Sequence, residues 1–185
     1  QFAYIFPSIG EELAKRTKYG KLDVVFIIDA TGSMEDNVIG VKDYINHFLK
    51  PFEEKNVDIK LGLVEFSDRD ARKEKVHDPD DPDKFKKWLS KMKFYGGRDL
   101  PESGYEAIIT ALEKIDYRKS AQKAFVFISD SPQHDFDYDG KSRYTLDRII
   151  AMLNEKHVSV DVIGLDFLPM KQLARGTGGQ WKNIP

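Results

Sequence analysis

Two segments of this chain, Leu22–Ile28 and Ala124–Ile128, are nearly continuous runs of apolar residues that favour β-structure. Such runs are typical of strands buried on both faces of a sheet. A third run spans Val158–Leu165, and apolar residues recur at helical spacing in the stretches between the runs. Because strands that alternate with helices form parallel βαβ units, we predict an α/β fold, a doubly wound, mostly parallel central sheet with helices on both faces.

The same patterns assign the remaining segments. Val57–Leu63 alternates as a strand, the charged stretch 71–76 is predicted as a weak edge strand, and a short last strand is expected over 179–184. Helices are expected over 38–52, after Pro82, and over 105–115, 146–153 and 170–175. Pro51 is expected near the end of the first of these helices, and Pro101 in the first turn of the third.

The charges nearly balance, with 29 Lys and Arg against 31 Asp and Glu and a formal net charge of −2. Nucleic-acid-binding domains normally carry a basic excess, so this balance argues against one.

No apolar run reaches the length of a membrane span, and the lack of cysteine excludes disulfides and thiolate metal sites. The sequence begins with Gln1 rather than Met, and we expect it to be part of a longer chain.

Polar residues follow two of the predicted strands directly. The first strand leads into Asp29-Ala30-Thr31-Gly32-Ser33, and the strand Ala124–Ile128 leads into Ser129-Asp130. In an open parallel sheet both segments lie at the carboxyl edge, where such folds bind ligands. Carboxylate and hydroxyl oxygens suit a hard divalent cation, so we predict a site for Mg²⁺, with Mn²⁺ or Ca²⁺ as alternatives.

Asp29-x-Thr31-x-Ser33-Met34 resembles the D-x-T-G-S-M form of the metal-ion-dependent adhesion motif of von Willebrand type A domains. Gly96-Gly97-Arg98-Asp99-Leu100-Pro101-Glu102 and Phe127–His134 resemble two further motifs of bacterial-type members, in the family's order. The resemblance spans about residues 21–184, and we predict one such domain over residues 21–185. It implies a Rossmann-like fold and a metal site made by Asp29, Thr31, Ser33, Asp99 and Asp130.

The resemblance also implies a function. In this family, the open position on the cation takes an Asp or Glu carboxylate from a partner protein. We therefore expect a non-enzymatic adhesion-type binding module, at an extracellular, cell-surface or periplasmic location by analogy only. The alternative is an assembly or scaffold module of a larger multidomain protein.

Three positions near the predicted site carry alternatives. Asp99 is expected as a ligand, but it is also well placed to cap the helix that follows Pro101. Arg98 could pair with an incoming carboxylate, or be an exposed loop residue. His134 is a candidate ligand contact, although a surface or supporting role is more common for a histidine at such a position.

A second acidic cluster, Asp135, Asp137 and Asp139 before Gly140, matches the first half of a calcium-binding loop. The twelfth position of that loop, normally a bidentate Glu, is Leu146. A solvated acidic loop is therefore the favoured interpretation, with a second calcium site as the alternative.

Enzyme classes find less support. A haloacid-dehalogenase-type phosphatase needs a carboxylate two residues after the first Asp, where this chain has Thr31. The chain has neither the G-x-x-x-x-G-K-[ST] phosphate loop nor the G-x-S-x-G nucleophile elbow. A metal-assisted hydrolase is the remaining enzymatic alternative.

Residues 1–20 form a separate N-terminal extension in the sequence pattern. Von Willebrand type A domains usually end with a helix after the last strand, and the sequence stops without one. Ser8 and Glu11 fit a capping box, and Ile9 and Leu13 share a helical face. We predict a helix over residues 9–18 that packs beside the first strand as a substitute.

Overall fold

The protein is described by a computed structural model that covers residues 1–68, 74–96 and 101–185. Within these ranges, six strands form one sheet in the order β3-β2-β1-β4-β5-β6. The strands are Lys21–Asp29 (β1), Asp58–Phe66 (β2), Lys75–Asp80 (β3), Gln122–Ile128 (β4), Ser159–Gly164 (β5) and Trp181–Asn183 (β6). The helices are Phe2–Arg16 (α1), the 3-10 turn Gly32–Met34 (η1), Glu35–Glu54 (α2), Pro82–Lys91 (α3), Gly104–Lys114 (α4), Leu146–Glu155 (α5) and Leu168–Gly176 (α6).

The sheet is parallel except at one edge. β1 pairs in parallel with β2 and with β4, β4 with β5, and β5 with β6, whereas β3 runs antiparallel to β2. The predicted fold class is confirmed: a mostly parallel sheet with helices on both faces. After β1 the chain adds β2 and β3 on one side of that strand, and then β4, β5 and β6 on its other side. The topological switch point therefore lies between β1 and β4.

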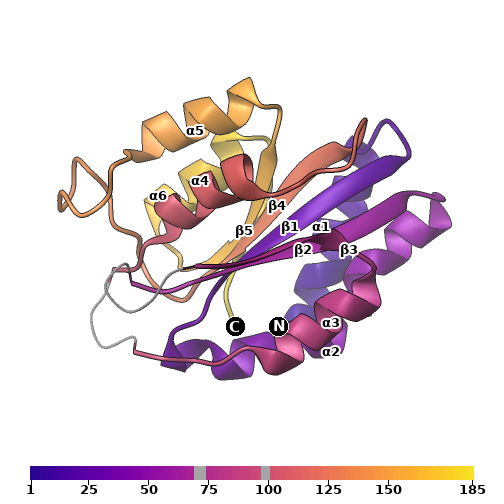
Figure 1. Ribbon diagram of the computed structural model, residues 1–185, viewed down its shortest axis with the longest axis horizontal. Coiled ribbons are helices and arrows are strands. Elements are labelled where there is room, and N and C mark those ends of the chain that lie inside the picture. The colour runs from indigo at the N-terminus through magenta and orange to yellow at the C-terminus, as the bar shows by residue number, and fades with distance from the viewer. Residues whose placement is uncertain (69–73, 97–100) are drawn as a thin grey trace.

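Two layers of helices cover the sheet (Figure 1). α1, α2 and α3 lie on one face, where their buried residues join Val24, Phe26 and Ile28 of β1 in one core cluster. α4, α5 and α6 lie on the other face, together with Val25 and Ile27 of β1. The side chains of β1 thus alternate between two apolar cores, which explains its nearly continuous apolar sequence. Of the described helices, none combines the length and hydropathy needed to cross a membrane.

The predicted N-terminal helix exists, but its expected start at Ile9 was wrong. α1 begins at Phe2, and Ser8 lies inside it rather than at its cap. The apolar residues Phe2, Ile5 and Phe6, which belong to the same core, extend the helix beyond the expected boundary. Local capping signals were outweighed because tertiary burial supplies most of a helix's stability.

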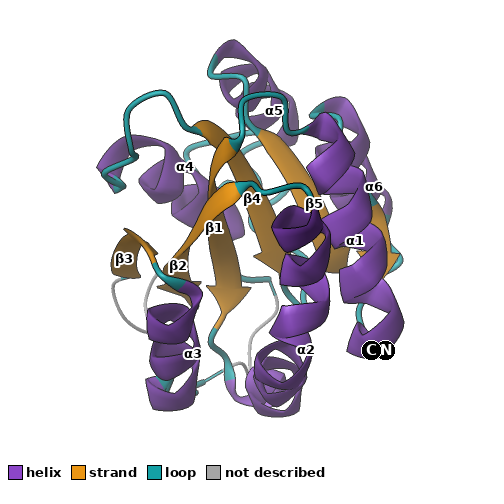
Figure 2. Cartoon of the chain, turned by 90° about the vertical axis from the view of Figure 1, so that its right-hand side faces the viewer, coloured by secondary structure: helices purple, strands orange, loops and turns teal. Residues whose placement is uncertain are grey.

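α1 packs closely against α2 and both lie over the same face of the sheet (Figure 2). Phe6, Ile9 and Leu13 have no exposed surface, and the Phe6 ring contacts the rings of Phe26 and Phe48 edge to face. Gly10 permits this approach, because a β-carbon there would lie 2.5 Å from the carbonyl oxygen of Phe48. The N-terminal segment is therefore an integral part of the core.

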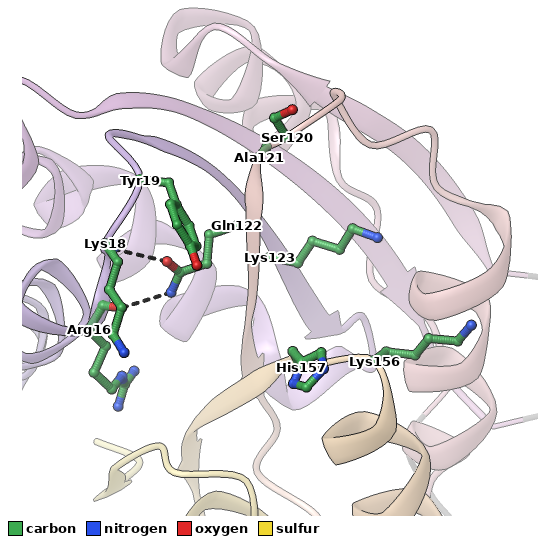
Figure 3. A pocket seen from close by; sticks show the side chains of 9 residues that line it. All are labelled: Arg16, Lys18, Tyr19, Ser120, Ala121, Gln122, Lys123, Lys156 and His157. Carbon is green, nitrogen blue, oxygen red and sulfur yellow. Dashed lines mark hydrogen bonds between the residues drawn. The ribbon is translucent and has the colours of Figure 1, made fainter.

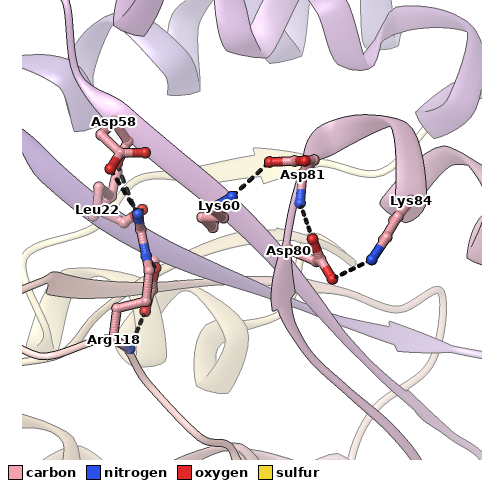
Figure 4. Close-up of polar contacts among 8 residues, drawn as sticks. Leu22, Asp58, Lys60, Asp80, Asp81, Lys84 and Arg118 are labelled. Atoms are coloured by element: carbon pink, nitrogen blue, oxygen red, sulfur yellow. Dashed lines mark hydrogen bonds and ion pairs between the residues drawn. The ribbon is translucent and has the colours of Figure 1, made fainter.

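Buried ion pairs tie the amino ends of the strands to the surrounding loops. Arg118 Nε donates to Asp23 on β1 at 2.7 Å, and its guanidinium also donates to the carbonyl oxygens of Leu22 and Asp58 (Figure 4). At the end of α1, Arg16 donates to the fully buried Asp161 of β5 at 3.0 Å. Each aspartate is thereby compensated by a cation, as burial of a charge requires.

Three of the boundaries that differ from the sequence predictions have a clear physical context. β3 occupies Lys75–Asp80, later than the expected 71–76, because pairing with β2 positions it; residues 69–73 lie outside the described ranges. α2 continues past Pro51 to Glu54, since burial of Phe52 outweighs the missing amide donor. α4 begins only at Gly104, so Pro101 precedes the helix.

The burial of α1 generates a stability prediction. Phe6→Ala should lower the free energy of unfolding by about 3–5 kcal/mol, because it removes a fully buried ring from the shared core. Tyr4→Ala is the matched control in the same helix, since Tyr4 is 79% exposed and its loss should change stability by less than about 0.5 kcal/mol. Urea unfolding of both variants measures the difference. Equal midpoints would show that α1 does not contribute to the core.

Candidate metal centre

The predicted site residues lie at the switch point of the sheet. In the parallel ladder, Ile28 of β1 is level with Ile128 of β4, so Asp29 and Ser129 leave the sheet side by side. This is the carboxyl edge, where backbone segments diverge and leave room for a ligand. The structure thus brings the first loop, Asp29–Ser33, next to the loop that contains Asp130.

Asp29 is the most constrained side chain of the site. It has no exposed surface, and its two carboxylate oxygens accept hydrogen bonds from opposite sides. Oδ1 accepts from the backbone N–H and the hydroxyl of Thr31, at 2.9 and 2.6 Å, and Oδ2 accepts from the hydroxyl of Ser129 at 2.8 Å. Burial raises the pKa of Asp29 to about 6, against these hydrogen bonds, and the negative charge of Asp130 acts in the same direction as burial.

The two hydroxyl residues of the first loop have different surroundings. Thr31 is buried, while Ser33 is exposed and has no hydrogen-bond partner among the described residues. Neither side chain caps the following helix: Thr31 makes no capping bond to η1, and the residue that precedes α2 is Met34. Within the described residues the Ser33 hydroxyl therefore makes no hydrogen bond, which fits the predicted role of a ligand.

Asp130 faces the same edge from the neighbouring strand. It is half-buried, and its Oδ1 accepts a hydrogen bond of 3.3 Å from the hydroxyl of Ser131. Its negative charge acts to raise the pKa of Asp29. A pair of neighbouring carboxylates, one of them partly exposed, attracts a divalent cation.

Arg98 and Asp99 lie outside the described residues, so their assignments stay predictions. The residues on either side of this gap do contact the site. Gly32 N–H donates to the Gly96 carbonyl at 3.4 Å, and Glu102 N–H donates to the Pro132 carbonyl at 2.9 Å. The second loop is thereby joined to the first loop at one end and to the Asp130 loop at the other.

Three polar residues support the site without having been assigned a role from sequence. The Ser129 hydroxyl accepts a hydrogen bond of 3.0 Å from the Gln133 side chain while it donates to Asp29. Gln133 Oε1 accepts from the N–H of Gly104 at 2.8 Å, which joins the start of α4 to this chain of contacts. Glu102 is fully buried and forms a short parallel bridge with Gln133.

A sequence signal existed for only one of these residues. Ser129 directly follows a buried strand, in the position level with Asp29, and could have been predicted to contact it. The partner of Gln133 depends on where α4 docks, which local sequence does not encode.

His134 is buried rather than exposed at the surface. It is 3% exposed, with Nδ1 at 2.6 Å from Asp139 Oδ2 and Nε2 at 3.4 Å from Asp68 Oδ1. Although burial acts to raise it, the hydrogen bonds from His134 and from nearby backbone N–H groups hold the pKa of Asp139 below its usual range. This geometry favours a role in holding the loop over direct contact with a partner.

The acidic loop folds around its own backbone. Asp135 accepts hydrogen bonds from the N–H groups of Asp137 and Leu146, both at 2.9 Å, and Asp139 accepts from that of Lys141 at 3.0 Å. In the described part of the chain, no three acidic or histidine side chains lie close enough together to hold a metal ion. These carboxylates form turns with the backbone, which favours the interpretation as an acidic loop, and the second calcium site stays an untested alternative.

The donor set at the sheet edge does fit a hard cation. It offers two carboxylates, Asp29 and Asp130, and two hydroxyls, Thr31 and Ser33, and all four donors are oxygens. A cation beside Asp29 would favour its charged form and so oppose the effect of burial. The ligand candidates among the described residues include no histidine, so this set differs from typical zinc sites, in which nitrogen or sulfur ligands predominate.

Comparison with known proteins places the chain in a family. Residues 23–173 match the family described as von Willebrand factor A domain. Integrin beta-6 of Rattus norvegicus is 24% identical over 157 residues, in a match that covers 69% of this chain and 20% of the integrin. The alpha-protein kinase vwkA of Dictyostelium discoideum is 24% identical over 122 residues, with 63% of this chain and 19% of the kinase covered. This chain thus spans about a fifth of the length of these relatives.

Solved structures share the fold. The VWA domain of SpRpn10 superimposes with a TM-score of 0.64 at 14% identity, over 89% of this chain and 88% of that domain. Proximal thread matrix protein 1 from the mussel byssus, with a zinc-occupied MIDAS motif, gives a TM-score of 0.65 at 15% identity over 89% of this chain and 42% of its own. At these identities the structures establish the fold alone. Because the family match covers most of the residues, this chain belongs to the von Willebrand factor A domain family.

Proposed function

We propose that this chain is a metal-ion-dependent protein-binding module, not an enzyme, and that its cation is Mg²⁺. The observation that carries the proposal is the arrangement of the first loop. Asp29 is held rigidly by Thr31 and Ser129, while Ser33 and Asp130 remain partly or fully exposed beside it. A cation with an open coordination position needs some ligand oxygens that the protein fixes in place and others that are accessible from solvent.

The open position is proposed to take an Asp or Glu carboxylate from a partner protein. A ligand set of Asp29, Asp99 and Asp130 would place three negative charges around a 2+ ion, so an incoming acid needs further positive charge. Arg98 is proposed to supply it through a bidentate pair. The relatives are consistent with a binding role, since they include an integrin and a protein with an occupied MIDAS motif.

A scaffold module within a larger protein is the second candidate. It is favoured by the relatives' length, because the matching region is a small part of each of them. The two candidates separate in a metal-dependent binding assay with a partner, because an adhesion-type contact is lost in EDTA and a scaffold contact is not.

A catalytic role has less support in the structure. The Ser33 hydroxyl has no hydrogen-bonded base among the described residues, and His134 is buried between Asp68 and Asp139. An activated nucleophile requires a base within hydrogen-bond reach. This observation motivates the proposal of a binding module over a metal-assisted hydrolase.

The first prediction tests the metal itself. Isothermal titration of the chain with Mg²⁺, Mn²⁺ and Ca²⁺ should show one principal site, and Asp29→Ala should abolish it, because the variant loses the central carboxylate. Asp137→Ala is the control, since Asp137 is exposed and lies in the acidic loop that the proposal excludes as a site. Unchanged titration of the Asp29 variant would rule out the assignment.

A second prediction concerns the support of Asp29. Ser129→Ala should weaken Mg²⁺ binding by about 10-fold or more, as expected for a residue that orients a metal ligand. It should also lower stability in metal-free buffer by about 1–3 kcal/mol, since buried partners lose a hydrogen bond. Ser90→Ala removes a hydroxyl from the exposed surface of α3 and should change neither quantity. A Ser129 variant with unaltered affinity would contradict the positioning role.

The third prediction decides the role of Asp99. If Asp99 is a ligand, Asp99→Asn should weaken metal binding and leave thermal stability in metal-free buffer nearly unchanged. If it is not a ligand, metal affinity should not change; a role as the cap of α4 no longer applies, because the N-cap of α4 is Ser103. Titration and thermal unfolding of the same variant give both readouts.

A further inference from the structure

A second concave surface lies at the end of the sheet opposite to the candidate metal centre. It is a cavity of about 700 Å³ at the amino ends of β1, β4 and β5. Its walls come from three separate segments: the end of α1 and the turn after it, the turn before β4 with the first residues of that strand, and the turn between α5 and β5 (Figure 3). The metal centre is at the carboxyl ends of the same strands, so the two surfaces do not overlap.

The cavity is strongly basic. Five of its lining residues carry basic side chains, and no aspartate or glutamate of the described residues lines it; the five are Arg16, Lys18, Lys123, Lys156 and His157. This concentration is notable in a chain whose formal net charge is −2. A concave surface of one sign focuses the electrostatic field and attracts ligands of the opposite sign.

Two of the five basic side chains have partners inside the protein. Arg16 is paired with Asp161, and Lys123 lies 4.6 Å from the centre of the Tyr117 ring. Lys18, Lys156 and His157 are exposed, and none of them pairs with a carboxylate in the described part of the chain. A ligand can therefore bind these three groups without breaking an internal ion pair.

The backbone around the cavity is already held in place. The Gln122 side chain accepts from the Lys18 N–H at 3.1 Å and donates to the Arg16 carbonyl at 2.9 Å, which fastens the turn after α1 to the start of β4. Arg16 also donates to the Gly178 carbonyl at 2.7 Å. A preorganised wall loses little conformational entropy when a ligand binds.

The placement of the cations indicates the shape of the ligand. The nitrogens of Arg16 and Lys18 lie on one side of the cavity, and those of Lys123 and Lys156 lie on the other (Figure 3). A single phosphate would need donors that converge on one point, whereas this spread suits several carboxylates along an extended segment. Tyr19, 75% exposed at the rim, adds an aromatic surface for an apolar group.

We infer that this cavity binds an acidic segment of a partner protein, with its carboxylates on Lys18, Lys156 and His157 and an apolar side chain against Tyr19. The contact needs no metal ion. A protein with one binding surface at each end of its sheet can engage two partners at the same time. The inference stands independently of the metal-dependent function proposed above.

The test uses a fluorescein-labelled peptide of six glutamates and two tyrosines, with binding followed by fluorescence anisotropy. The wild-type chain should bind it in EDTA, with an affinity that falls as salt rises from low to physiological concentration. The double variant Lys18→Glu, Lys156→Glu should bind at least about tenfold more weakly, because two attractive pairs become repulsive. The control Lys87→Glu, Lys91→Glu makes the same change of net charge on α3 and should retain most of the affinity.

Several results would overturn the inference. An equal loss in both double variants would show an effect of net charge alone, and binding that disappears in EDTA would assign the peptide to the metal centre. Displacement of the peptide by millimolar inorganic phosphate would indicate a phosphate site instead. Tighter binding of a single-stranded oligonucleotide than of the peptide, lost in the Lys18 and Lys156 variant, would indicate a nucleic-acid site. Thermal unfolding of each variant verifies that it is folded.

Discussion

The parallel pairing of β1 with β2 on one side and β4 on the other is the constraint on which the rest of the molecule depends. It buries β1 on both faces and on both edges, so that only its ends are available to ligands. It also aligns Asp29 with Ser129, which allows one hydroxyl to hold the central carboxylate. A change in register by one residue would move every side chain of β1 to the opposite face and separate this pair.

The helix layers make that alignment rigid. α1 joins α2 and α3 over one face, and its last residue, Arg16, pairs with Asp161 of β5. The first helix of the chain thus covers strands that come last in the sequence. On the other face, α4 begins at the hydrogen bond from Gly104 to Gln133, so the position of a whole helix is coupled to the side chains around Asp29.

The two ends of the sheet have opposite electrostatic character. The carboxyl end gathers Asp29, Asp130 and the acidic loop of Asp135, Asp137 and Asp139, whereas the amino end carries the basic cavity. A net charge of −2 conceals this separation, because the two signs nearly cancel over the chain. The overall balance argued against a dedicated nucleic-acid binder, but it carries no information about local surfaces, since association depends on the local field.

Sequence alone determined the fold class and the residues of the first loop. Apolar runs such as Leu22–Ile28 require burial on both faces, and polar residues placed directly after such runs must emerge at the edge of the sheet. Only tertiary structure decided where α1 begins and that Asp139 is hydrogen-bonded to His134. It also decided that Gln133 and Glu102 support the Asp130 loop. These contacts join segments whose local patterns are independent of each other. The basic cavity has the same origin: its basic side chains are scattered from Arg16 to His157 in the sequence, and only the packing of three separate segments brings them together.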